Sequence, residues 1–151
     1  MNLLELMLHE KVEWPVVAEF AAQDGDDRTV HFCFESPVKS EFGQRYWVTP
    51  GVTAHSKIRI NTLSDDWSTR IITREEYQSV GGWMKWGGGK RPVSSGSMVN
   101  FVARGDVVIL VGIAGSIEWH HCGEESDIIA YRLINQQPVQ LDNPEIEPSI
   151  G

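Results

Sequence analysis

Residues 92–121, with the sequence PVSSGSMVNFVARGDVVILVGIAGSIEWHH, carry the pattern that decides the predicted fold. They contain runs rich in β-branched residues, broken at Arg104-Gly105-Asp106 and again at residues 112–115. β-branched residues favour extended backbone, and glycine-containing breaks between such runs are typical of turns. Because the stretch has no helical period, we predict short strands of a small antiparallel barrel or sheet, with Arg104-Gly105-Asp106 in a hairpin turn.

The N-terminal residues predict a helix followed by a hairpin. Residues 2–10 carry apolar side chains at helical spacing, with Asn2 in position to cap the helix. A strand over residues 16–21, the turn-forming residues 23–27 and the alternating segment 28–35 predict a β-hairpin.

The region between the hairpin and the glycine-rich stretch predicts a loop, a strand and a short helix. Residues 36–58 contain repeated proline and glycine and are expected to be loop-rich. Residues 67–72 predict a strand. Thr73 then begins a helix, because its spacing to Glu76 matches the capping box.

Taken together, these patterns predict an α+β fold that is mainly β. A helix and hairpin module covers residues 1–80. A small antiparallel barrel or sheet module covers residues 81–135 and ends in a strand over residues 126–134. The polar, proline-rich segment 136–151 is expected to be a mobile tail.

Length and composition are those of a soluble globular protein. The chain has 151 residues, of which 41% are hydrophobic and 23% are charged. Thirteen Lys and Arg against 21 Asp and Glu give a net charge of -8, which argues against direct binding to the phosphate backbone of nucleic acids. The N-terminal residues lack the basic region of a signal peptide, and no stretch approaches the roughly 18 apolar residues of a membrane span. We therefore expect a cytoplasmic protein with reduced thiols, no membrane contact and no cofactor.

The glycine-rich stretch GGWMKWGGGKRPV, residues 81–93, does not match a phosphate-binding loop. Such a loop has a glycine five positions before Gly89 and Ser or Thr two positions after it, but this chain has Met84 and Arg91 there. The stretch therefore predicts a turn that leads into the strand beginning at Met98.

Basic and aromatic side chains in and near this turn are candidates for a binding cleft. Trp and Tyr rings can stack on a nucleotide base, and Lys and Arg can pair with phosphates or with an acidic partner. The alternative role for the tryptophans is packing in the core. The candidate ligand-binding or partner-binding residues are Trp83, Trp86, Lys90, Arg91, Trp119, His121, Tyr131 and Arg132.

Two His-x-Cys pairs are candidate zinc ligands. His31 and Cys33 lie two residues apart, as do His120 and Cys122, so each pair would share one face of a strand. If the two strands were neighbours, the four side chains could form a tetrahedral site. His-x-Cys is not one of the usual zinc-ligand spacings, so we favour cysteines that pack as small apolar side chains and predict no metal.

Glu118 and His121 are candidates for general acid–base catalysis. No recognised nucleophile accompanies them, since Ser116 lacks the glycines two positions before and after it that a G-x-S-x-G elbow requires. A non-enzymatic protein is therefore favoured, and a hydrolase remains an alternative.

The second half of the chain resembles a family of small uncharacterised proteins of tailed bacteriophages and prophages. The shared pattern is Trp-x-x-Trp, a glycine pair, Pro-Val, a valine-rich strand with Arg and Gly, then Trp-x-His and Asp-Ile-Ile-Ala-Tyr-Arg. In the first half, VEWPVVAEFAAQD and LSDDWSTRIITREEYQ are also similar to phage sequences. The pattern falls on Trp83, Trp86, Gly87, Gly88, Pro92, Val93, Trp119, His121 and residues 127–132.

The resemblance implies a phage or prophage origin and a place in the cytoplasm of a bacterial host, and it implies no reaction or catalytic residue. Together with the acidic charge and the absence of a catalytic set, it favours an accessory protein that binds and inhibits a host factor. By analogy of context, that factor would be an antiviral defence component. The alternatives are a small-molecule binder that sequesters a nucleotide signal, and a hydrolase that uses Glu118 and His121.

Overall fold

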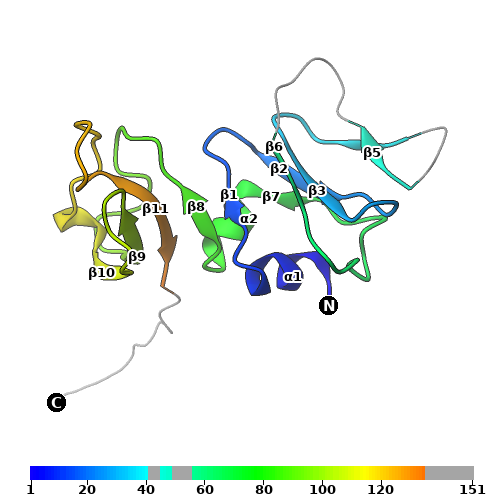
Figure 1. The fold of residues 1–151 in the computed structure, drawn as a ribbon, viewed down its shortest axis with the longest axis horizontal. Helices are drawn as coiled ribbons and strands as arrows, with labels where there is room; N and C mark the ends of the chain where they lie inside the picture. Colours follow the sequence, from blue (N-terminus) through cyan, green and yellow to red (C-terminus); the bar gives the residue numbers. More distant parts are fainter. Residues whose placement is uncertain (41–44, 49–55, 135–151) are drawn as a thin grey trace, which may run out of the picture.

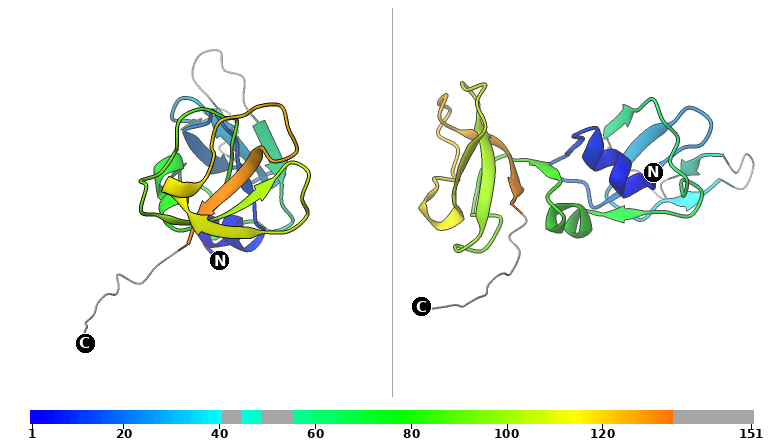
Figure 2. Two further views of the ribbon diagram at one scale, coloured as in Figure 1. Left: turned by 90° about the vertical axis from the view of Figure 1, so that its left-hand side faces the viewer. Right: turned by 90° about the horizontal axis from the view of Figure 1, so that it is seen from below.

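The computed structural model describes residues 1–40, 45–48 and 56–134, and it has two lobes side by side (Figure 1). The first lobe contains the N-terminal helix and a four-stranded sheet, and the second contains most of a five-stranded sheet. Figure 2 shows, from below, the narrow connection between the lobes. The mainly β, α+β class predicted from the sequence is confirmed. The predicted tail, residues 136–151, lies outside the described residues.

Helix α1 (Leu3–His9) begins at the predicted cap, Asn2. The Asn2 side chain accepts a 2.8 Å hydrogen bond from the N–H of Glu5, and the Glu5 carboxylate accepts a 3.0 Å hydrogen bond from the N–H of Asn2. This reciprocal pair satisfies two backbone donors at the start of the helix. The face that packs into the first lobe carries the buried side chains Leu3, Leu6 and Met7.

The first lobe is built on a four-stranded sheet in the order β6-β3-β2-β7. Its centre is the predicted hairpin, in which β2 (Phe20–Gln23) and β3 (Thr29–Cys33) pair antiparallel. The first strand of the hairpin starts at Phe20 rather than at residue 16, because residues 16 and 17 lie in an exposed turn.

Residues 36–58, predicted to be loop-rich, contribute to three short strands in their described part. β6 (Ser56–Arg59) pairs antiparallel with β3 and forms one edge of the four-stranded sheet. β4 (Val38–Lys39) and β5 (Trp47–Val48) form a separate two-stranded ribbon. Strands of two to four residues lack enough alternation to be distinguished from loop in the sequence.

The predicted strand over residues 67–72 is wrong for most of its length. The carbonyl of Asp66 accepts backbone hydrogen bonds from Thr69 and Arg70 and closes a turn. Only β7 (Ile72–Thr73) is extended, and it pairs with β2 at the other edge of the sheet.

Helix α2 (Arg74–Ser79) is capped by Thr73, as predicted. The hydroxyl oxygen of Thr73 accepts a 3.1 Å hydrogen bond from the N–H of Glu76. The carboxylate of Glu76 pairs with the guanidinium of Arg70 instead of completing the capping box.

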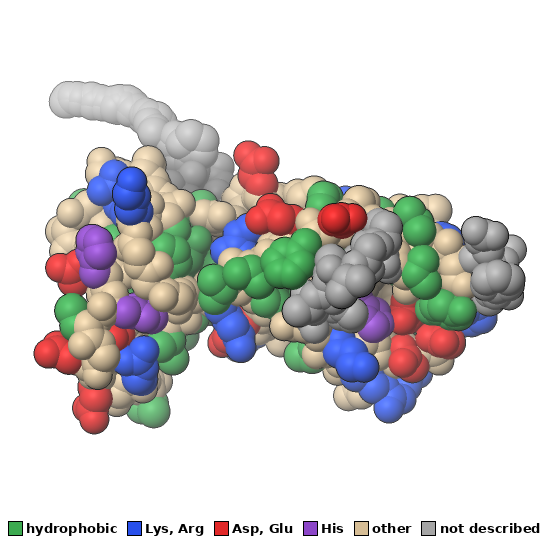
Figure 3. All heavy atoms as spheres, turned by 90° about the horizontal axis from the view of Figure 1, so that it is seen from above, with side chains coloured by type: hydrophobic (Ala, Val, Ile, Leu, Met, Phe, Trp, Pro, Cys, Tyr) green, Lys and Arg blue, Asp and Glu red, His purple; other side chains and the backbone are tan. Residues whose placement is uncertain are grey.

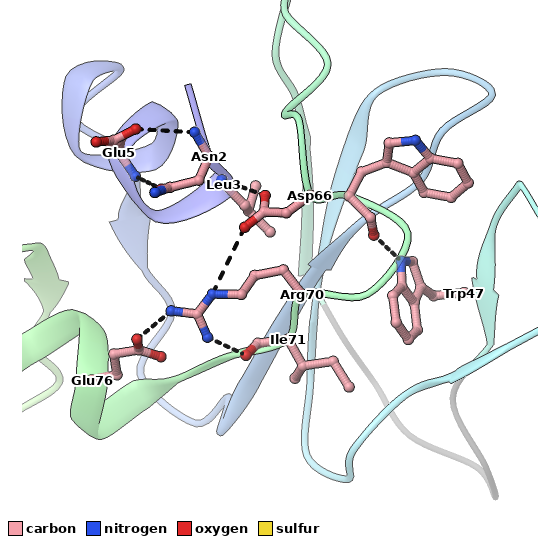
Figure 4. A network of polar contacts seen from close by, with 9 residues as sticks. Asn2, Leu3, Glu5, Trp47, Asp66, Arg70, Ile71 and Glu76 are labelled. Carbon is pink, nitrogen blue, oxygen red and sulfur yellow. Dashed lines mark hydrogen bonds and ion pairs between the residues drawn. The ribbon is translucent and has the colours of Figure 1, made fainter.

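Arg70 lies at the centre of a polar network that ties both helices to the turn between them (Figure 4). Its guanidinium contacts Glu76, donates a 3.0 Å hydrogen bond to the carbonyl of Ile71, and lies 4.0 Å from the carboxylate of Asp66. The other carboxylate oxygen of Asp66 accepts a 2.8 Å hydrogen bond from the N–H of Leu3. The network fixes the start of α1 against the turn that replaces the predicted strand.

The second lobe is built on a five-stranded sheet in the order β1-β8-β11-β9-β10. The first pair in this order is parallel and the others are antiparallel. The strands are β1 (Glu13–Trp14), β8 (Trp83–Lys85), β9 (Met98–Ala103), β10 (Leu110–Ile113) and β11 (Ile128–Leu133), with the short 3-10 helix η1 (Ala114–Ser116) after β10.

Most of this sheet follows the sequence prediction. The strand from Met98, the turn at Arg104-Gly105-Asp106 and the final strand are confirmed. The sequence does not predict β1 or β8. Because β1 precedes residue 80 and β8 follows it, the sheet crosses the predicted module boundary, and the division at that residue stays a prediction.

The core of the first lobe is arranged around Trp14, whose side chain is fully buried. Its ring lies 5.1 Å from that of Phe32 and 5.5 Å from that of Tyr77. The Tyr77 hydroxyl donates to the carbonyls of Val12 (2.6 Å) and Met7 (3.2 Å), and burial raises the pKa of this phenol. Tyr77 therefore joins α2 to the chain that enters β1.

Candidate functional site

Alternation along β8 separates the two tryptophans that the sequence suggests for one cleft. Successive side chains of a strand point to opposite faces of the sheet. Met84 is fully buried on the core side, where Trp86 also packs. Trp83 lies on the other face, where the guanidinium of Arg132 is 5.0 Å from its ring centroid. Arg132 is held there by a 3.1 Å hydrogen bond to the side-chain oxygen of Asn100.

Trp86, Trp119 and Tyr131 form an edge-to-face aromatic cluster inside the second lobe. Their ring centroids are 5.5–6.1 Å apart. The indole N–H of Trp86 donates to the carbonyl of Trp119, and that of Trp119 donates to the carbonyl of Ala114. Trp119 and Tyr131 are 3% and 1% exposed, so these two rings pack the core and offer no open face to a ligand, whereas Trp86 is partly buried against them.

The remaining predicted binding residues lie at the glycine-rich turn. Gly88 has a φ of +95°, which favours glycine, and its Cα faces the imidazole of His121. His121 Nε2 is 2.6 Å from the carbonyl oxygen of Ile128. Lys90 and Arg91 are exposed. The eight predicted residues thus lie on two faces of a sheet and in a turn, and the structure does not bring them together around one cavity.

The four His and Cys side chains of the suggested zinc site are not brought together. His31 and Cys33 are on β3 in the first lobe, whereas His120 and Cys122 follow η1 in the second lobe. All four are described residues, and they form no group with metal-ligand spacing.

The described residues do contain one group of acids close enough to share a cation. Oxygen atoms of Asp24, Asp26 and Asp27 lie within 4.8 Å of one another. Two of these acids already organise the β2–β3 turn. The Asp24 carboxylate lies 2.8 Å from His31 Nε2 and accepts a hydrogen bond from the N–H of Trp47. The Asp27 carboxylate accepts a hydrogen bond from the N–H of Thr29, and this bond lowers the pKa of Asp27. These contacts account for the positions of Asp24 and Asp27 without a metal.

Glu118 and His121, the suggested acid–base pair, have different partners. Glu118 lies 3.1 Å from the imidazole of His120, and this hydrogen bond lowers the pKa of the exposed Glu118 carboxyl. His121 instead contacts the carbonyl of Ile128. The geometry gives no shared proton path between the two candidates.

A groove of about 610 Å³ lies at the junction of the lobes. It lies between the chain around β1 and the edge strand β6, and Figure 3 shows apolar side chains flanked by basic ones where the lobes meet. A volume of this size falls in the usual range for ligand sites. The apolar part of its wall consists of Val12, Pro15, Val16, Val17, Phe32 and Ile58.

A tightly held turn presents two of these apolar side chains to solvent. The indole N–H of Trp14 donates a 2.8 Å hydrogen bond to the carbonyl of Ala18, and Arg74 donates a 2.8 Å hydrogen bond to the carbonyl of Pro15. Between these anchors, Val16 and Val17 remain 45% and 60% exposed. The two hydrogen bonds from Trp14 and Arg74 therefore hold the turn in position, and the valines stay exposed on it.

Charged side chains surround the apolar wall. Three lysines, Lys11, Lys57 and Lys85, line the groove together with two glutamates, Glu10 and Glu13. This is a local excess of positive charge in a chain whose net charge is -8. The combination suits an extended segment that carries both apolar and acidic side chains.

Sequence reasoning missed this groove because its residues come from four separate parts of the chain, residues 10–17, 32, 56–58 and 85. Each lysine stands alone in the sequence, at positions 11, 57 and 85. The one local signal was the pair Val16-Val17 directly after Trp-Pro, which we assigned to a strand.

Comparisons with protein families, with curated proteins and with solved structures found no match. In the described part of the chain, no helix has the length and apolar character needed to cross a membrane.

Proposed function

We propose that this protein is a non-enzymatic binding protein that holds an extended segment of another protein in the groove between its lobes. The observation that carries the proposal is the groove itself, in which exposed valines and three lysines face one cavity. An extended segment fits better than a compact ligand because two sheet edges, β1 and β6, border the groove. Strand edges offer unpaired backbone groups to a peptide.

Apolar contacts supply most of the affinity in this proposal. Covering the exposed parts of Val16, Val17 and Ile58 contributes about 1 kcal/mol for each side chain. Solvent-exposed ion pairs with lysines contribute about 0.2–1 kcal/mol each, and they are weakened by salt. The lysines therefore select an acidic segment and speed its approach, while the apolar wall retains it.

The phage resemblance supplies the setting of the proposal. In a bacterial host, a phage protein with such a groove captures a host protein, and we propose that capture inhibits a host factor of antiviral defence. The net negative charge of the chain reduces nonspecific binding to nucleic acids. In this proposal the groove alone makes the specific contact with the partner protein.

A capture experiment with charge-reversed variants tests this function. The full chain is immobilised and exposed to lysate of a bacterial host, and bound proteins are identified. We expect the Lys57→Glu, Lys85→Glu double variant to lose a protein that the wild-type chain retains. The matched control is Lys90→Glu, which reverses an exposed lysine outside the groove and should retain it. Equal capture by all three forms would contradict the proposal.

A further inference from the structure

The edge of the second lobe carries a run of exposed apolar side chains. Strand β10 is the last in the order of the five-stranded sheet, so one of its edges has no strand neighbour among the described residues. In and just before it, the exposed fraction ranges from 38% at Leu110 to 99% at Val107. The exposed residues are Val107, Val108, Ile109, Leu110, Val111 and Ile113.

The free edge also offers backbone groups. β10 pairs antiparallel with β9, and Gly112 lies opposite Val99. Two residues further along, the N–H of Ala114 points the same way as that of Gly112 and donates a 2.8 Å hydrogen bond to the carbonyl of Ser97. Hydrogen-bonded residues alternate along an antiparallel strand, so the N–H and C=O of Val111 point away from β9. Val111 therefore presents an exposed side chain and an outward-facing backbone at the same position.

The usual protection of a sheet edge is missing here. Natural edge strands are blunted by lysine, proline or a bulge. The segment from Val107 to Ile117 contains no charged residue and no proline, and β10 pairs with β9 without a register shift. An edge of this kind is expected to be covered by another strand.

We propose that a second copy of this chain covers the edge, with β10 of the two copies pairing antiparallel about a two-fold axis at Val111. The two five-stranded sheets then form one continuous ten-stranded sheet. A two-fold contact needs only a self-complementary surface. Pairing about Val111 sets Leu110 of one copy opposite Gly112 of the other, which places a large side chain beside a small one.

Charge favours a second copy at this edge over contact elsewhere on the molecule. Two chains of net charge -8 repel one another over most of their surface. The segment from Val107 to Ile117 is the exception, because it brings no charged side chain into the contact. Like copies can therefore meet there without burying like charges.

The available area indicates a reversible dimer. A Val, Leu or Ile side chain carries about 60–120 Å² of apolar surface, so the six exposed fractions amount to roughly 200–400 Å² in each copy. A standard stable interface buries about 800 Å² on each partner. Even with the added backbone hydrogen bonds, this interface is smaller than that of a standard stable complex. We therefore expect a weak dimer whose population rises with protein concentration.

Sedimentation velocity over two orders of magnitude in protein concentration tests the proposal. We expect the wild-type chain to convert from monomer to dimer and Val111→Lys to raise the dissociation constant by about tenfold or more, since each dimer would bury two lysines at the axis. The matched control is Val17→Lys, which changes an equally exposed valine in the first lobe, at 60% against 61%. Circular dichroism verifies that both variants fold.

Oxidative cross-linking provides a second readout. In a Cys122→Ser background, which removes the exposed native thiol, Val111→Cys should form a disulfide-linked dimer and Val17→Cys should not. A wild-type chain that stays monomeric, or two valine variants that behave alike in either experiment, would overturn the proposal. Val111 lies outside the groove, so failure of this dimer proposal and failure of the proposed function are separate results.

Discussion

The indole N–H of Trp86 donates a 2.7 Å hydrogen bond to the backbone carbonyl of Trp119, and the two rings meet edge to face. This pair makes both tryptophans part of the core of the second lobe, although a glycine-rich turn follows Trp86 directly. Trp119→Ala should therefore reduce the free energy of unfolding by about 3–5 kcal/mol. Urea denaturation followed by circular dichroism measures this loss. Lys90→Ala, at an exposed position of the same turn, should stay within about 0.5 kcal/mol of wild type. A similar small effect for Trp119→Ala would mean that the ring lines an open cleft.

Gly82 is required by the ring of Tyr77. A Cβ at residue 82 would overlap this ring, which is fully buried and hydrogen-bonded to Val12 and Met7. Overpacking of this kind typically costs about 1–3 kcal/mol, so Gly82→Ala should lower the unfolding free energy by that amount.

Gly96 provides the control for this prediction. A Cβ at Gly96 meets no atom within 4 Å, and Gly96→Ala should be close to neutral in the same denaturation experiment. Equal effects at the two glycines would show that contact with Tyr77 is not the cause.

Asp127 organises the loop before β11. Its carboxylate accepts hydrogen bonds from the N–H groups of Cys122, Gly123 and Glu124 and from the guanidinium of Arg104. The bond from Cys122 is the largest of the effects that hold the pKa of Asp127 at about 2, below its ordinary value of 3.8. A carboxyl with a lowered pKa stabilises the fold above its ordinary pKa, and this contribution is lost as the pH falls toward 2.

The pH dependence of Asp127→Asn tests this arrangement. Asparagine cannot carry the charge that the four donors face, so the variant should have a lower Tm at pH 7. The difference in Tm should shrink as the pH falls from about 4 to about 2, where the wild-type carboxyl also becomes neutral. If the difference in Tm between wild type and Asp127→Asn stayed constant over this pH range, the loss of stability would come from the shape of the side chain and not from its charge.

Local patterns in the sequence were sufficient for the elements with several alternating or capped residues. Asn2 and Thr73 cap helices as predicted, β3, β9 and β11 lie in predicted strand segments, and β2 overlaps only the end of the strand predicted over residues 16–21. The two-residue strand β1 and the three-residue strand β8 gave no readable period, and they acquire their structure from pairing with each other and with β11. The predicted strand at residues 67–72 failed because the Asp66 carbonyl closes a turn there.

The candidate site was harder to predict than the fold. Trp83 and Trp86 look like neighbours in the sequence, yet alternation along β8 sends them to opposite faces. Conversely, Lys57 and Lys85 are far apart in the sequence and line one groove. Such a groove depends on how the lobes meet, and single-sequence periodicity contains no information on that contact.

Site-specific photo-cross-linking tests the proposed function most directly. A photoreactive amino acid replaces Val16 in the groove or, as control, Val80 at the end of α2; these valines are 45% and 42% exposed. After irradiation in a bacterial host, we expect a discrete host-protein adduct from position 16 and none from position 80. An equal adduct from both positions, or no host-protein adduct from position 16, would contradict the assignment of the groove as the binding site.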